Sequence, residues 1–217
     1  MNSENHYYSS FPDSKVRFHT ISVTLRRHLY LFKTISGVFS YKKLDLGTKI
    51  LVENMIIPQK PSNLMDLGCG YGVIGIVLAH ESPLSKIYLI DVNKRAIWCT
   101  KENVKINMPT SKSRFFIMQG SYFEPLKDKK IMFDGIYMNP ALRQGRRSLL
   151  NLLSDLSFYL KSTGTFQFVV RKKMGADYIL KYIKDQFSEE NVEVICKKSG
   201  YWVFRFGQQK LKLPTNK

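Results

Sequence analysis

The sequence predicts a doubly wound α/β fold, in which a mostly parallel sheet carries helices on both faces and ends in an antiparallel hairpin. Two observations predict it. From residue 63 onward, short apolar runs alternate with segments of helical spacing, a pattern typical of a parallel sheet. The last two runs, 192–197 and 201–206, are separated by only Lys198-Ser199-Gly200, too few residues for a crossover helix, so they must pair antiparallel.

An N-terminal β segment is predicted ahead of the alternating part. Residues 16–39 are rich in β-forming side chains and indicate a hairpin or meander. Residues 47–57 have helical spacing, and Pro58 ends that helix. Further strands are expected at 63–67, 86–90, 114–118, 133–138 and 165–171, and helices at 73–80, 94–106, 149–160 and 176–187. The tryptophans Trp98 and Trp202 are expected in the core.

The chain is expected to form one domain. It has 217 residues, of which 44% are hydrophobic, enough for a single core. We divide it into an N-terminal tail (1–15), the β segment with its helix (16–57), the core (58–207) and a basic tail (208–217). No apolar run has the length of a membrane span, and residues 1–10 lack the pattern of a secretion signal. Three scattered cysteines indicate neither zinc nor disulfides, so we expect a cytoplasmic protein without a metal.

The charge balance indicates a polyanionic partner. Lys and Arg number 34 against 17 Asp and Glu, which gives a formal net charge of +17. This excess is larger than solubility requires, and RNA or DNA is the usual partner of such a chain. A bias of the whole organism toward lysine is the alternative explanation.

A glycine-rich turn follows the first strand of the alternating part. It reads Asp66-Leu67-Gly68-Cys69-Gly70-Tyr71-Gly72 and precedes a helix, so its backbone can approach a ligand closely. The leading carboxylate of Asp66 would repel a pyrophosphate and attract an ammonium or sulfonium group. The turn therefore suggests a nucleoside with a cationic amino-acid tail, which is the shape of S-adenosylmethionine. The predicted contacts in the turn are Asp66, Gly68, Cys69, Gly70 and Gly72.

Polar residues also stand at the ends of the following strands, where open α/β sheets bind ligands. Asp91, with Val92 next to it, is placed to accept the hydroxyls of a ribose. Gly120-Ser121 is placed at an adenine amine, and Asn139-Pro140 ends the fourth strand. Asp91 alone would more often be a helix cap. The conjunction of these residues favours cofactor binding.

The glycine turn together with Phe133–Pro140 resembles the amino-methylating branch of class I methyltransferases. The segment from Gly37 to Leu51 more specifically resembles the small-subunit ribosomal RNA guanine methyltransferases and their archaeal single-domain relatives, and the resemblance covers about residues 6–207. It implies a Rossmann-like fold, S-adenosylmethionine as cofactor with S-adenosylhomocysteine as product, and no metal.

The resemblance also implies a role for the Asn-Pro loop. An exocyclic amine is a poor nucleophile because its lone pair is delocalised into the ring. Carried over, the side-chain oxygen of Asn139 and the carbonyl of Pro140 would accept the two amine hydrogens and aim the lone pair at the methyl group. Proline stiffens the loop. Catalysis would then be mainly positioning and electrostatics.

This sequence departs from the family pattern in two places. The family has Asn-Pro-Pro followed by an aromatic or apolar residue, whereas this chain has Ala141 in place of the second proline and then Leu142 instead of an aromatic residue. Relatives often carry Asp where this chain has Ser121. Leu142 can still pack against a base, although without aromatic stacking.

Basic residues near the predicted site are assigned to RNA. Just beyond the Asn-Pro loop come Arg143, Arg146 and Arg147, and Lys172 and Lys173 follow the fifth strand. They could hold phosphates on either side of an extruded base, although a solvated face is the simpler explanation of such a run.

We therefore expect a methyltransferase that acts on a base amine in RNA, with guanine in ribosomal RNA favoured by the resemblance and transfer RNA as an alternative. Adenine in RNA or DNA, and a protein glutamine amide, also present a planar amine to an Asn-Pro loop. An RNA-binding assembly factor that kept the fold but methylates weakly is the non-enzymatic alternative. A monomer or weak homodimer that does not bind membranes is expected.

Overall fold

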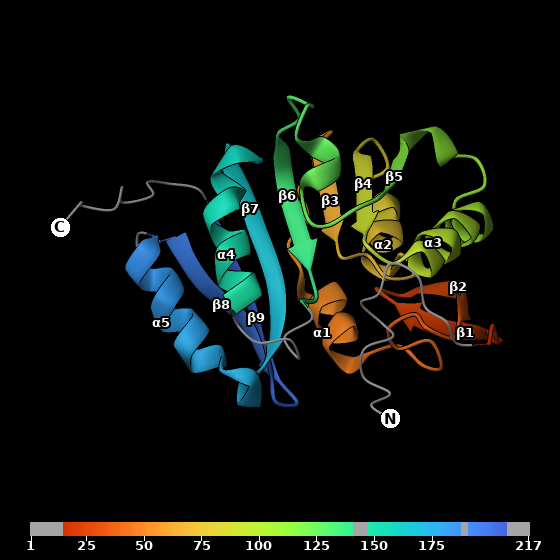
Figure 1. The fold of residues 1–217 in the computed structure, drawn as a ribbon, viewed down its shortest axis with the longest axis horizontal. Helices are drawn as coiled ribbons and strands as arrows, with labels where there is room; N and C mark the ends of the chain where they lie inside the picture. Colours follow the sequence, from red (N-terminus) through yellow and green to blue (C-terminus); the bar gives the residue numbers. More distant parts are fainter. Residues whose placement is uncertain (1–14, 141–146, 188–190, 208–217) are drawn as a thin grey trace.

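The computed structural model describes residues 15–140, 147–187 and 191–207, in which the strands form a sheet of seven and a separate pair (Figure 1). The strands are β1 (Phe18–Leu25), β2 (His28–Ile35), β3 (Asn63–Leu67), β4 (Lys86–Asp91), β5 (Phe115–Gln119), β6 (Phe133–Met138), β7 (Leu160–Arg171), β8 (Val192–Lys198) and β9 (Tyr201–Gly207). The helices are α1 (Leu46–Asn54), α2 (Val73–Glu81), α3 (Lys94–Asn107), α4 (Arg147–Asp155) and α5 (Ala176–Gln186), with short 3₁₀ turns at 112–114, 124–126, 156–158 and 172–174.

The large sheet has the order β5-β4-β3-β6-β7-β9-β8. Strands β3 to β7 pair in parallel, whereas β9 runs antiparallel to both β7 and β8. The predicted fold class is therefore confirmed, including the closing hairpin and the N-terminal strand pair. The order of the strands reverses between β3 and β6, which is where ligands bind in sheets of this kind.

Helices cover both faces of the large sheet (Figure 1). Apolar side chains of α1, α2, α3 and the β1–β2 hairpin pack against one face. Those of α4 and α5 pack against the other face. The N-terminal segment therefore shares a hydrophobic core with the sheet. Helix α1 lies next to the carboxyl end of β6 (Figure 1), and Asp45 and Thr48 at its start accept hydrogen bonds from Asn139, which follows β6.

The β1–β2 hairpin turns at Arg26-Arg27, which both have positive φ angles of 45° and 68°. This conformation is unfavourable for non-glycine residues. The guanidinium of Arg26 compensates by donating hydrogen bonds to the carbonyls of Val52 and Met55 and by pairing with Glu81 at 3.4 Å. The tip of the hairpin is thus fixed against the carboxyl-terminal ends of α1 and α2.

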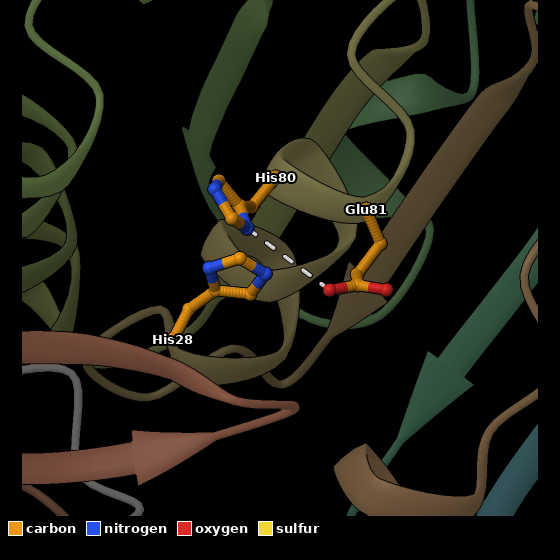
Figure 2. A group of neighbouring side chains, drawn as sticks. All are labelled: His28, His80 and Glu81. Atoms are coloured by element: carbon orange, nitrogen blue, oxygen red, sulfur yellow. Dashed lines mark ion pairs between the residues drawn. The ribbon is translucent and has the colours of Figure 1, made fainter.

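A pair of histidines completes this junction, as Figure 2 shows. The ring of His28, at the start of β2, meets the ring of His80 on α2 edge to face at 4.0 Å between centroids. The Nδ1 atom of His80 lies 4.0 Å from Oε1 of Glu81. Burial and the neighbouring His28 lower the pKa of His80, although Glu81 opposes the shift.

Two local expectations were wrong. The helix predicted at 149–160 ends at Asp155, and Leu160 already begins β7. Leu156 and Leu160 are both buried, and their spacing in the sequence matches that of a helix. The apolar pattern therefore extends beyond the residue at which the helix ends. Trp98, expected in the core, is 41% exposed and packs against Phe18 of the hairpin. Trp202 is buried as predicted.

Candidate active site

A cavity of about 650 Å³ lies along the carboxyl edge of the parallel strands. Residues that follow β3, β4, β5 and β6 line it, together with the end of β7 and the start of β9. Its volume is in the range of small-molecule sites, which is roughly 300–1,000 Å³. The strand ends identified in the sequence therefore meet around one cleft.

The glycine turn after β3 forms one wall of this cleft. Gly68, Gly70 and Gly72 have φ angles of 72°, 57° and 89°, which side chains other than glycine rarely adopt. A Cβ atom built on Gly68 or Gly70 would meet nothing within 4 Å, so the backbone there faces open space. The turn thus leaves room for a ligand to contact the main chain.

Asp66 lies beneath the turn and is fully buried. Its Oδ2 atom accepts a hydrogen bond from the backbone N–H of Gly75 at 2.8 Å, and its Oδ1 atom has no hydrogen-bond partner among the described residues. Burial raises the pKa of this carboxyl to about 7, although the Gly75 hydrogen bond opposes the shift. Asp66 is not among the residues that line the cavity, so its structural contact is with helix α2.

Asp91, at the end of β4, lines the cavity and fixes the shape of the turn. Its Oδ2 atom accepts from the N–H of Gly70 and its Oδ1 atom from the N–H of Asn93, both at 2.8 Å. Burial raises the pKa of Asp91, and these two hydrogen bonds oppose the rise. Each oxygen keeps a further lone pair that can accept from a ligand hydroxyl.

The structure brings most of the predicted cofactor contacts to this cavity. Those that line it are Gly68, Cys69, Gly70, Asp91, Val92, Gly120, Ser121 and Asn139, and Pro140 lines it as well. Gly72 does not line the cavity and instead caps helix α2. The thiol of Cys69 is buried 3.6 Å from the hydroxyl of Thr100, and burial raises its pKa.

Asn139 is held by two acceptors on the first turn of α1. Its Nδ2 atom donates to Oδ2 of Asp45 at 2.9 Å and to Oγ1 of Thr48 at 2.8 Å. Because a carboxylate can only accept, the amide nitrogen must face Asp45. The Oδ1 atom of Asn139, which accepts no hydrogen bond from any described residue, is therefore left for another donor.

The first turn of α1 is itself held by hydrogen bonds to a capping carboxylate. Asp45 is its N-cap and accepts from the backbone N–H of Thr48 at 2.8 Å. The hydroxyl of Thr48 lies 3.3 Å from the same carboxylate oxygen, to which it can donate. An aspartate at this position satisfies a helix N–H that would otherwise lack a partner. One carboxylate thus organises both the helix end and Asn139.

The segment between β2 and α1 forms another wall of the cleft. Val38, Phe39 and Ser40 line the cavity. Asn93 donates to the carbonyl of Gly37 at 2.7 Å, and the guanidinium of Arg95 donates to that of Ser36 at 2.8 Å. The segment is therefore fastened to the start of α3.

Asp45, Thr48 and Tyr201 line this cleft, although sequence reasoning assigned no role to them. The spacing of Asp45 and Thr48 matches a helix N-cap, a signal that the sequence did contain. Tyr201 lines the cleft because β9 runs antiparallel to β7. The first residue of β9, Tyr201, therefore pairs with the last residue of β7, Arg171. Arg171 itself also lines the cavity.

The predicted RNA contacts have different outcomes. Lys173 lines the cavity, whereas Lys172 is exposed and its Nζ atom lies 5.9 Å from the ring centroid of Trp202. Leu142, Arg143 and Arg146 fall outside the described residues, as does Ala141. Arg147 begins α4, and its side chain is not described.

A family model for the methyltransferase small domain matches residues 30–205. The chain belongs to the methyltransferase small domain family. It is 34% identical over 200 residues to the uncharacterised protein YbxB of Bacillus subtilis, a match that covers 92% of this chain and 96% of YbxB. It is 29% identical over 179 residues to ribosomal RNA small subunit methyltransferase C of Buchnera aphidicola, covering 80% of this chain and 48% of that protein.

Solved structures of methyltransferases share the fold. The 16S rRNA N2 methyltransferase RsmC of T. thermophilus, solved with AdoMet and guanosine, matches with a TM-score of 0.74 at 18% identity, over 91% of this chain and 52% of that one. Precorrin-6y C5,15-methyltransferase of Geobacter metallireducens matches with a TM-score of 0.57 at 16% identity, over 82% and 94% of the two chains. The chain thus spans about half the length of the RsmC proteins that it matches.

These findings confirm the resemblance of the sequence to RsmC-type class I methyltransferases. In the part of the chain that the structure describes, no helix is both long enough and apolar enough to span a bilayer.

Proposed function

We propose that this methyltransferase transfers a methyl group from S-adenosylmethionine to the exocyclic amine of a guanine in ribosomal RNA. The observation that carries the proposal is the fixed amide of Asn139, whose free oxygen lies in the same cleft as the glycine turn. The names of the RsmC relatives support ribosomal RNA as the substrate.

The residues of the cleft fit the cofactor. The open backbone at Gly68 and Gly70 suits close approach by a ligand, and Asp91 offers acceptors to ribose hydroxyls. Val92, Gly120 and Ser121 would border the adenine, as the sequence suggests. When bound, S-adenosylmethionine supplies an electrophilic methyl group. No residue in the proposed mechanism forms a covalent bond to the substrate.

Asn139 acts on the target amine. Its Oδ1 atom accepts one amine hydrogen, and the carbonyl of Pro140 accepts the other. These two hydrogen bonds draw the nitrogen toward tetrahedral geometry and free its lone pair for attack, and the methylated nitrogen then loses one of its hydrogens as a proton to solvent. Asp45 and Thr48 hold the amide still, so little reorganisation is needed when the reaction occurs.

The charge of the chain supports an RNA substrate. The net charge is +17, and Arg171 and Lys173 line the cleft beside the proposed target position. They would bind phosphates next to the extruded base. Lys172 and the arginines 143, 146 and 147 stay predicted RNA contacts from the sequence. We propose a cytoplasmic monomer or weak homodimer that acts on the small ribosomal subunit, with transfer RNA as a second candidate substrate.

The amide network also favours an enzyme over an RNA-binding factor that merely kept the fold. Binding RNA needs no fixed acceptor in the cofactor cleft, whereas methylation of an amine does. The exocyclic amine of adenine and the side-chain amide of glutamine could also donate to Asn139. Asn139 by itself therefore does not select guanine, and the choice of base depends on other residues.

Mass spectrometry tests the reaction directly. Small ribosomal subunits and total RNA from cells that lack this protein are incubated with it and methyl-labelled S-adenosylmethionine. Nucleosides are then separated. We expect labelled N2-methylguanosine. A label found only in methyladenosine would refute guanine as the target base. The absence of label in every nucleoside would refute RNA as the substrate.

The variant Asn139→Ala tests the assigned role. We expect methyl transfer to fall by about 100-fold or more, since a positioned acceptor in the transition state contributes several kcal/mol. Calorimetry should find nearly unchanged affinity for S-adenosylmethionine. Asn151→Ala, on the exposed face of α4, is the matched control. Equal activity of the two variants would contradict the role of Asn139.

A further inference from the structure

The carboxylate of Asp45 has a second oxygen that the proposed reaction does not use. All of its described hydrogen bonds, to Thr48 and Asn139, go to Oδ2. The Oδ1 atom accepts none from any residue that the structure describes. Asp45 is half-buried and lines the cleft. An acceptor without a partner therefore stands next to the amide that is proposed to hold the target amine.

An aromatic side chain borders the same part of the cleft. Tyr201 is half-buried at the start of β9 and lines the cavity. Its ring packs on Gly47, where an added Cβ would lie 2.9 Å from Cε1 of the tyrosine. The guanidinium of Arg171 lies 5.8 Å from the ring centroid. A phenol ring held in this way offers a flat face for stacking a base.

We propose that Asp45 and Tyr201 form the subsite for the target base and make it selective for guanine. The inference rests on the proposed function, because it concerns the base that Asn139 holds. Guanine carries an N1–H donor directly next to its N2 amine. The Oδ1 atom of Asp45 accepts from N1 while Asn139 accepts from N2, and Tyr201 stacks on the ring.

The same arrangement rejects the other bases that carry an amine. Adenine and cytosine place an acceptor nitrogen next to the exocyclic amine. With either base at Asn139, the carboxylate of Asp45 would face a lone pair and would lose its own donor. Sites built to hydrogen-bond a substrate discriminate strongly against analogues that lack the donor, because a buried polar group is then left unpaired.

Tyr201 also addresses the departure at residue 142. The family pattern that this sequence resembles has an aromatic or apolar residue after the Asn-Pro loop, and this chain has the non-aromatic Leu142 there. In the proposed subsite the stacking surface comes from β9 instead of from that loop. The antiparallel pairing of β9 with β7 is what brings the tyrosine to the ligand edge.

RNA oligonucleotides with guanine or 2-aminopurine at the target position isolate the role of Asp45. 2-Aminopurine keeps the N2 amine but has an acceptor at N1. For the wild-type protein we expect kcat/KM to be about 100-fold higher with guanine, the scale of one unpaired polar group. In Asp45→Asn, whose side chain can still cap α1, the preference should fall below about 10-fold. Asp128→Asn, an exposed residue outside the cleft, is the control.

Nucleotide binding gives a measurement that does not need catalysis. With S-adenosylhomocysteine present, GMP should bind more tightly than AMP, and Asp45→Asn should remove the difference. Tyr201→Ala should weaken GMP binding by about 10-fold, the scale of one stacked base, whereas Tyr201→Phe should preserve it.

The outcomes separate the two proposals. Selective binding of GMP without any methyl transfer would refute the proposed function and support the subsite. Methyl transfer with equal use of guanine and 2-aminopurine, or an unchanged preference in a folded Asp45→Asn protein, would overturn the subsite and leave the function standing.

Discussion

Replacing Thr48 by valine should reduce methyl transfer while leaving cofactor binding intact. Thr48 is buried, and its hydroxyl accepts one of the two amide hydrogens of Asn139 at 2.8 Å. Valine has nearly the same shape but no acceptor. The remaining hydrogen bond, to Asp45 at 2.9 Å, would fix the amide at one hydrogen only.

The magnitude follows from the unpaired donor. An amide hydrogen left without a partner in a partly buried site costs about 1–3 kcal/mol. If the amide turns away from its productive orientation to recover that energy, the cost is added to the barrier of the reaction. At about 1.4 kcal/mol for each factor of ten, kcat should fall by roughly 5- to 150-fold.

The assay compares Thr48→Val with Thr48→Ser. Serine keeps the hydroxyl and loses only a methyl group, so it controls for packing. We expect kcat for Thr48→Ser within a few-fold of wild type and the affinity for S-adenosylmethionine unchanged in both variants. A kcat for a folded Thr48→Val protein within twofold of that for Thr48→Ser would refute the idea that Thr48 orients Asn139.

Three further predictions concern charge. Because the folded pKa of His80 is lowered, the unfolded chain binds more protons, so stability measured by urea unfolding should fall as pH drops below about 6.5; a flat profile in this range would contradict it. The raised pKa of Asp66 acts in the opposite direction, because the folded protein binds the extra proton: wild-type stability should fall as the pH rises from about 4 to about 7, and the stability of Asp66→Asn relative to wild type should rise over that range, so a constant difference would refute this. Removing Arg171 and Lys173 together should flatten the salt dependence of RNA binding by about 1.4 in log–log slope, whereas Lys130→Ala should not; equal slopes would place the RNA elsewhere.

The cofactor half of the cleft could be predicted because it is local in the chain. The glycine turn, Asp91 and Gly120 each follow a strand whose apolar pattern is plain, and parallel strands place these ends at one edge. The orientation of Asp66 could not be predicted in this way. Its strand lies in the middle of the sheet, so its side chain is covered.

The target half could be predicted only in part, because it depends on long-range contacts. Asn139 was identified from its position after β6, yet the residues that hold it, Asp45 and Thr48, come more than 90 positions earlier. A cap signal indicates where a helix begins, but it does not indicate what else the capping carboxylate touches. Tyr201 was missed for the same reason, since its place depends on the register of β9 against β7.

The turn between β8 and β9 lies at the edge of the sheet where ligands bind. Ser199 and Gly200 both have positive φ angles, and the carbonyl of Gly200 accepts from the N–H of Lys172 at 2.7 Å. Insertions at this turn would alter the neighbourhood of Tyr201 without changing the register of the strands or touching Gly68–Gly72. Changes in substrate can therefore arise at this one hairpin while the cofactor-binding part of the cleft stays the same. Related chains can then act on different targets and still bind the cofactor in the same way.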